Sequence, residues 1–143
     1  MSKVAVIYWS GTGNTEAMAN LVAEGINAAG AEADVFAVSD ISADDAAKYD
    51  KLALGCPAMG DEELEDSEFQ PFYDALCPQL DGKKIVLFGS YSWAEGQWMQ
   101  TWEEQVKSST KAELVAEPVI SYEAPDDEAS AKCKALGEAL AKA

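Results

Sequence analysis

Short apolar runs alternate along the chain with longer segments in which apolar residues recur every three or four positions. Nearly continuous apolar runs of this length are typical of parallel strands that are covered on both faces. The last run is interrupted near Pro118, because proline cannot donate to a strand ladder. The pattern predicts five strands: Val4–Tyr8, Glu32–Val38, Lys51–Gly55, Ile85–Phe88 and Glu113–Tyr122.

The segments between the runs have helical spacing. Ser42 is an expected N-cap, with two aspartates in the turn that follows. The five expected helices are Asn14–Ala29, Ser42–Tyr49, a segment bearing Phe69, Phe72, Tyr73 and Leu76, a segment bearing Trp98, Trp102 and Val106, and a last one bearing Ala129, Cys133, Leu136 and Leu140.

Alternating strands and helices with short connections require parallel strands and right-handed crossovers. We therefore expect residues 1–143 to form a single α/β domain, a three-layer α/β/α sandwich. Its five-stranded parallel sheet has the expected order 2-1-3-4-5, the common doubly wound order at this length. In such sheets ligands bind beyond the carboxyl ends of the strands, so the loops after strands one, three and four hold the candidate site.

Composition excludes several kinds of chemistry. The 143 residues include no histidine, which removes Ser-His-Asp and Cys-His catalysis and most zinc sites. The three widely spaced cysteines, Cys56, Cys77 and Cys133, form no C-x-x-C pair and are interpreted as buried free thiols. We expect no metal site and no catalytic residue.

The net charge of −16 predicts repulsion from nucleic acid and from anionic membranes, and attraction to basic protein surfaces. It is equally compatible with a role in solubility alone. No apolar run approaches the ~20 residues that span a bilayer, and we expect no signal peptide, because the start lacks a charged n-region with a small-residue cleavage site. The expected location is the cytoplasm, and the expected state is a monomer.

The loop after the first strand, Ser10–Thr15, has the chemistry of a phosphate site. Two glycines, Gly11 and Gly13, allow a tight turn with inward N–H groups, and the following helix adds its dipole. The loop is neither a Walker A loop nor a G-x-G-x-x-G fingerprint, and it contains no basic residue. Neutral donors would hold one permanently bound monophosphate; they are Ser10, Thr12, Asn14 and Thr15.

Three segments carry a resemblance to a known family. Tyr8–Glu16 resembles the phosphate loop of the short-chain (clostridial-type) flavodoxins, and Gly55–Glu62 and Gly89–Trp93 resemble their two flavin loops. The resemblance covers nearly the whole chain. It implies non-covalently bound FMN and a low-potential one-electron carrier that shuttles between the semiquinone and hydroquinone. It also implies redox partners such as ferredoxin-type oxidoreductases, a hydrogenase or a reductase.

The resemblance also assigns the site residues. Met59 and Trp93 would cover the two flavin faces, although Met59 also suits a gap in the core. The Gly60–Asp61 peptide would flip toward the flavin N5–H after reduction, and Glu62 would accept from the flavin N3–H. The full set is Trp9, Ser10, Gly11, Thr12, Gly13, Asn14, Thr15, Pro57, Ala58, Met59, Gly60, Asp61, Glu62, Ser90, Tyr91, Ser92 and Trp93.

The chain departs from the family pattern at Ser92 and Ala94, where glycine is usual. Trp98 and Trp102 have helical spacing and are interpreted as core residues. The alternative function is an FMN-dependent quinone reductase-like enzyme. That alternative needs space over the flavin and basic residues nearby, and these loops contain none.

Overall fold

The computed structural model describes residues 3–9, 13–57, 68–91 and 97–143. Its strands form one parallel sheet of order β2-β1-β3-β4-β5, which confirms the predicted order, and β6 also pairs with β4. The strands are β1 (Lys3–Tyr8), β2 (Glu32–Ala37), β3 (Lys51–Gly55), β4 (Lys84–Tyr91), β5 (Glu113–Leu114) and β6 (Val119–Tyr122).

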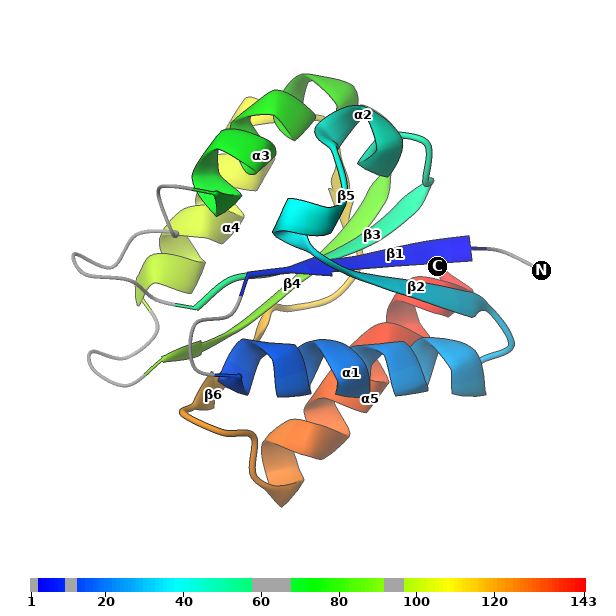
Figure 1. Cartoon of the computed structure of the whole chain (residues 1–143), viewed down its shortest axis with the longest axis vertical. Helices are drawn as coiled ribbons and strands as arrows, with labels where there is room; N and C mark the ends of the chain where they lie inside the picture. Colours follow the sequence, from blue (N-terminus) through cyan, green and yellow to red (C-terminus); the bar gives the residue numbers. More distant parts are fainter. Residues whose placement is uncertain (1–2, 10–12, 58–67, 92–96) are drawn as a thin grey trace.

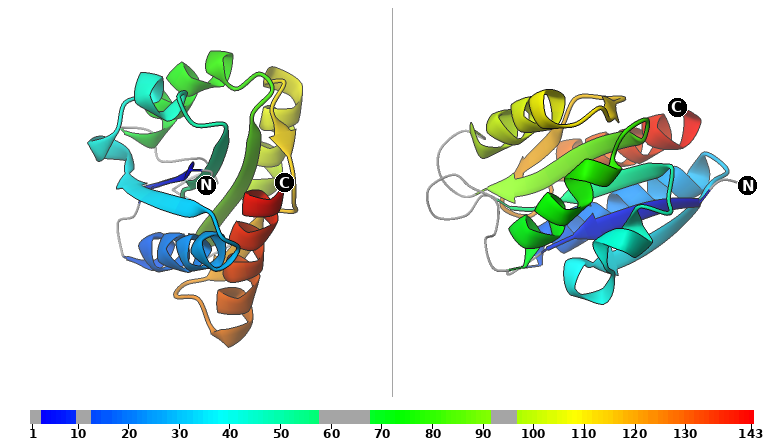
Figure 2. Two further views of the ribbon diagram at one scale, coloured as in Figure 1. Left: turned by 90° about the vertical axis from the view of Figure 1, so that its right-hand side faces the viewer. Right: turned by 90° about the horizontal axis from the view of Figure 1, so that it is seen from above.

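Helices cover both faces of the sheet, which confirms the predicted three layers (Figure 1). Helices α1 (Asn14–Ala28) and α5 (Asp127–Lys142) lie on one face. The other face carries α2 (Ala43–Ala46), α3 (Phe69–Leu76) and α4 (Gln97–Ser109), as the two views in Figure 2 also show. Two single turns of 3-10 helix, η1 (Val38–Asp40) and η2 (Cys77–Gln79), follow β2 and α3.

The central strands β1, β3 and β4 bury both of their faces, which explains their continuous apolar runs. In β1, Ala5 and Ile7 pack with α3 and α4, whereas Val4 and Val6 pack with α1 and α5. Trp98 and Trp102 of α4 are each 1% exposed, so the prediction that they are core residues is confirmed. The two layers bury so much apolar surface that the sheet forms a rigid support for the loops at its ends.

Helices α1 and α5 approach each other closely through two glycines. A Cβ built on Gly25 would lie 2.0 Å from the carbonyl oxygen of Lys134. A Cβ on Gly137 would lie 2.0 Å from the carbonyl oxygen of Val22. Because only glycine allows this separation, these positions set the spacing of the helix layer that carries the first turn of α1.

Several element bounds differ from the expectation; the predicted helix Ser42–Tyr49, for example, is observed as α2 over Ala43–Ala46 only. The predicted fifth strand is split into β5 and β6 by Val115–Pro118, which confirms the break near Pro118. Strand β4 does not end at Phe88 but continues through Ser90 to Tyr91, which the sequence placed in a loop. The reason is long-range pairing: β6 lies beside β4 in the register Phe88↔Val119 to Tyr91↔Tyr122 and extends the sheet there.

Candidate functional site

The three predicted ligand loops start from neighbouring strand ends. Tyr8, the last residue of β1, lies opposite Gly55, the last residue of β3, and Gly55 lies opposite Phe88 in β4. Parallel strands present their carboxyl ends at the same edge of a sheet, so residues after Tyr8, Gly55 and Tyr91 emerge together there. The fold thus brings the carboxyl ends of β1, β3 and β4, from which the three predicted loops start, to one edge (Figure 1).

Gly13 caps the N-terminus of α1 in a left-handed conformation, with φ 92° and ψ −8°. Its carbonyl oxygen accepts from the Ala17 N–H at 3.0 Å, so the helix ladder begins at this residue. A glycine cap has no side chain to bond the N–H groups of the first turn. Among the described residues, no atom lies within 4 Å of the position that a Cβ on Gly13 would take. The start of α1 therefore has the space and the dipole for an anion.

Thr15, the second residue of α1, joins the helix to β4. Its Oγ1 lies 3.0 Å from the Oγ of Ser90, and either hydroxyl can be the donor. Both side chains are buried, with exposed fractions of 1% for Thr15 and 4% for Ser90. The pair fixes the first turn of α1 against the carboxyl end of the central strand β4.

Two aromatic residues, at and just after the end of β1, each donate a hydrogen bond to a carboxylate. The Tyr8 hydroxyl donates to Glu16 Oε2 at 2.8 Å, and the Trp9 Nε1–H donates to Glu68 Oε1 at 3.2 Å. The second bond joins the loops after β1 and β3. Burial, and then the hydrogen bond to Glu16, raise the pKa of Tyr8 to about 12, so its hydroxyl stays protonated as a donor at neutral pH.

These side chains border a pocket of about 390 Å³ in front of α1. The volume is within the range of small-molecule sites. Its lining is more polar than apolar, and it combines the aromatic rings of β1 with the glycine cap and two carboxylates. The lining residues are Tyr8, Trp9, Gly13, Glu16, Ala37, Val38, Ser39 and Glu68.

The start of the loop after β3 is held firmly. The Cys56 N–H donates to the Phe88 carbonyl at 3.2 Å, and the buried Trp98 Nε1–H donates to the Cys56 carbonyl at 3.2 Å. A Cβ on Gly89 would lie 2.2 Å from that same carbonyl oxygen, so only glycine fits there. Pro57 thus begins its loop from a fixed backbone position.

The structure places part of the predicted site set. Trp9, Gly13, Asn14, Thr15, Pro57, Ser90 and Tyr91 all lie at this edge, although the Ser90 hydroxyl bonds to Thr15 and Tyr91 belongs to β4. The remaining predicted residues lie outside the described ranges: Ser10, Gly11, Thr12, Ala58, Met59, Gly60, Asp61, Glu62, Ser92 and Trp93. The sequence did not single out Glu16 and Glu68 as partners of Tyr8 and Trp9, because no local pattern encodes contacts between separate loops.

A second pocket, of about 560 Å³, is lined partly from the amino ends of the strands. Lys3 begins β1, and Asp50 directly precedes β3. Ligands of doubly wound sheets bind at the carboxyl ends instead, so we favour the smaller pocket in front of α1. In the described ranges, no group of three or more His, Cys, Asp or Glu residues is placed to hold a metal ion.

Comparison with known proteins identifies the family to which the chain is similar. Residues 6–136 match the model of the flavodoxin family. The chain is 49% identical to a flavodoxin of Megasphaera elsdenii over 98% of this chain and 99% of the relative. It is 45% identical to a flavodoxin of Clostridium beijerinckii over 95% of this chain and 97% of the relative. The solution structure of two-electron-reduced Megasphaera elsdenii flavodoxin superposes with a TM-score of 0.89 at 48% identity, covering 98% of this chain and 99% of that chain.

The chain belongs to the flavodoxin family, whose members bind FMN and carry electrons. This confirms the predicted short-chain resemblance, the cofactor and the class of electron-transfer protein rather than enzyme. The described residues fit FMN. The space found at Gly13 among the described residues, the buried hydroxyl pair and the glycine cap of α1 suit its phosphate, and the pocket beside Trp9 suits an aromatic group.

Proposed function

We propose that this chain is a low-potential one-electron carrier that holds one FMN at the carboxyl edge of β1, β3 and β4. The observation that carries the proposal is the glycine-capped first turn of α1, with open space at Gly13 and the hydroxyl of Thr15 behind it. This arrangement offers backbone donors to a monophosphate without any cationic side chain.

The phosphate would lie against the loop Ser10–Thr15, with Gly13 giving the turn its left-handed backbone. Neutral donors and a helix dipole bind a dianion without the charge that a lysine would add. Such a site suits a cofactor that stays bound while electrons pass, better than a nucleotide that must exchange.

The flavin ring would lie between Met59 and Trp93, with the Gly60–Asp61 peptide and Glu62 at its polar edge. These assignments follow from the family resemblance. The bound FMN supplies a ring that accepts and releases electrons one at a time. The chain's own groups orient that ring, exclude water from its faces and set the surrounding charge.

Negative charge supports a low potential. Glu16 and Glu68 border the pocket, and the run Asp61 to Glu68 contains five acids besides Glu68. One carboxylate ~8 Å from a developing anion disfavours it by about 2 kcal/mol at an effective dielectric of ~20. Salt screens the outer carboxylates, so the nearest ones dominate.

The partners we propose are redox proteins with basic docking surfaces, because the chain carries a charge of −16. Within the described ranges, no helix is both long enough and apolar enough to cross a bilayer. A single domain over residues 1–143, a monomeric state and a cytoplasmic location remain parts of this proposal.

A stepwise reductive titration tests the function. The purified holoprotein is reduced anaerobically while its visible spectrum and potential are recorded. We expect two separate one-electron steps, with the second at strongly negative potential, and no steady oxidation of NADH. A single two-electron step accompanied by steady NADH turnover would instead support the quinone reductase-like alternative.

A further inference from the structure

Tyr122 is unusually exposed for a large aromatic side chain. Its exposed fraction is 61%, and it ends β6 at the carboxyl edge of the sheet. Val35, on the edge strand β2, is the other large apolar side chain classed as exposed among the described residues, at 39%. An aromatic ring left in water is a frequent centre of protein–protein contacts, where its burial contributes most of the binding energy.

The Tyr122 ring is anchored on one side. It packs edge to face on Tyr91, with ring centroids 5.6 Å apart and planes at 74°. Tyr91 packs in turn on the buried Trp98, with centroids 5.9 Å apart. The ring is therefore presented as a fixed platform, and a partner would lose little side-chain entropy by ordering it.

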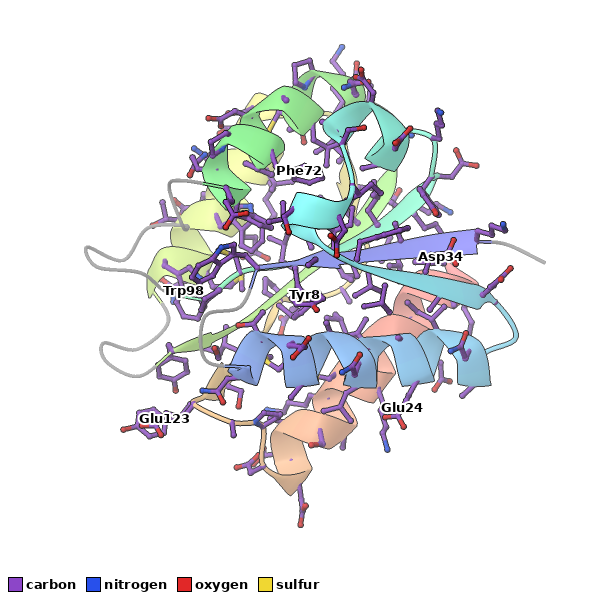
Figure 3. All side chains as sticks on the ribbon, viewed as in Figure 1. Tyr8, Glu24, Asp34, Phe72, Trp98 and Glu123 are labelled. Carbon is purple, nitrogen blue, oxygen red and sulfur yellow. The ribbon has the colours of Figure 1, made fainter. Side chains whose placement is uncertain are left out.

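A carboxylate is fixed beside the ring. The Glu123 N–H donates to the Tyr91 carbonyl at 2.7 Å, in the position that continues the β4–β6 ladder. Figure 3 shows Glu123 on the same side of the molecule as Trp98, whereas Glu24 lies further along α1. Residues 112–131 contain six acids and no basic residue, so the chain segment that carries the ring is acidic, although Lys132 directly beyond it pairs with Glu128.

We propose that Tyr122 and Glu123 form a docking contact for a redox partner protein that presents a cationic side chain from an apolar surface. The cation would lie over the Tyr122 ring and pair with the Glu123 carboxylate. The patch continues the same sheet edge as the site, since Tyr91 directly precedes residues 92–96. This inference rests on the proposed electron-carrier function and names the part of the surface that partners contact.

Electron transfer to two acceptors tests the contact. The FMN-loaded, reduced protein is mixed with a lysine-rich cytochrome c or with a small neutral benzoquinone, and second-order rate constants are measured at several salt concentrations. Tyr122→Thr keeps a strand-forming residue but removes the ring, and Tyr122→Phe keeps the ring. Glu123→Asn removes the charge. Asparagine tolerates the left-handed backbone conformation of position 123, where φ is 56°.

We expect Tyr122→Thr and Glu123→Asn each to lower the cytochrome c rate by about threefold to tenfold at low salt, with Tyr122→Phe close to the parent protein. The controls Val35→Thr and Glu24→Gln, which remove an exposed apolar group and a charge elsewhere, should change it less than about twofold. Rates with the quinone should be equal in all variants.

The proposal is overturned if Tyr122→Thr slows cytochrome c no more than Val35→Thr, or if Glu123→Asn matches Glu24→Gln. It is also overturned if concentration-dependent self-association, removed by Tyr122→Thr, shows that a second copy of this chain covers the patch. Failure of the parent protein to reduce even the quinone is a different result: it removes the electron-carrier function itself, and the docking contact with it.

Discussion

The hydroxyls of Thr15 and Ser90 lie 3.0 Å apart in the interior and join the first turn of α1 to the carboxyl end of β4. The two residues are 75 positions apart in the chain. If Ser90 donates to Thr15, the Thr15 proton is free to point toward a phosphate at the helix N-terminus. Ser90 would then position the Thr15 donor instead of binding the ligand itself.

We therefore expect Ser90→Ala to weaken FMN binding by about fivefold while leaving riboflavin binding nearly unchanged, because only FMN carries the phosphate. The buried Thr15 hydroxyl would lose its partner, and the apoprotein should lose about 1–2 kcal/mol of unfolding free energy. A double-mutant cycle with Thr15→Val, measured by urea unfolding and flavin fluorescence, gives the coupling. Additive effects of the two substitutions would show that the hydrogen bond contributes nothing.

Gly13 allows a test of backbone conformation alone, because a Cβ there would meet no atom within 4 Å. We expect Gly13→Ala to cost about 1–2 kcal/mol of stability, since alanine disfavours the left-handed region. The substitution should also weaken FMN binding measured by fluorescence quenching.

Gly30 supplies the matched control for Gly13. It has the same φ of 92° and the same open space, but it follows α1 at its far end. Gly30→Ala should lower stability by a similar amount and leave FMN affinity unchanged. Equal losses of FMN affinity in the two variants would mean that Gly13 has no special role in the site.

The contact between α1 and α5 predicts that Gly25→Ala and Gly137→Ala are strongly destabilising. Each new Cβ would lie 2.0 Å from a backbone carbonyl oxygen of the other helix, so the helices would have to separate. We expect a loss of about 1–3 kcal/mol in urea unfolding, despite the better helix propensity of alanine. Asn20→Ala, on the exposed face of α1, should be neutral; a neutral Gly25→Ala would show that the helices adjust easily.

The buried thiol of Cys133 leads us to expect that the stability of the protein depends on pH. Burial raises the pKa of its thiol to about 11, because the thiolate would be charged inside the α1–α5 layer. The native state then holds the thiol proton more tightly than the unfolded state does. Its contribution to stability, at most about 3 kcal/mol, is complete below the unfolded pKa and is lost as pH rises toward 11.

We expect the unfolding free energy to fall more steeply between pH 9 and 11 in the parent protein than in Cys133→Ala. The Cys133 thiol should also resist a thiol reagent at pH 8 until urea is added. Parallel pH profiles for the two proteins would show that this thiol does not contribute. Tyr8 and Tyr49, whose pKa values are raised to about 12 chiefly by burial, titrate in both proteins alike.

Local patterns predicted most of the fold. The expected bounds of β3 match the structure, and Ser42 caps α2 as predicted, accepting from the Asp45 N–H at 3.1 Å. Both features depend on a few consecutive residues. The end of β4 could not be predicted in the same way, because Ser90 and Tyr91 become strand only through pairing with β6, some 30 residues later.

The sequence pointed to the start of α1 as part of the candidate site, but it could not predict the side-chain contacts found there. Gly13 and Thr15 lie where the glycine and hydroxyl pattern placed them, at the start of α1. The bonds from Trp9 to Glu68 and from Thr15 to Ser90 join distant segments, and one acid in an acidic run does not differ in sequence from its neighbours. Such pairings are decided by the sheet order and not by local composition.

Binding of FMN to the apoprotein, followed by fluorescence and by backbone amide NMR shifts, tests the central claim most directly. We predict one FMN per chain, with quenched fluorescence and amide shifts concentrated in residues 9–15, 56–62 and 90–96. The amides of Gly13 to Thr15 should shift with FMN but much less with riboflavin. Unquenched fluorescence, or shifts gathered instead around Lys3 and Lys48 in the second pocket, would contradict the proposed site.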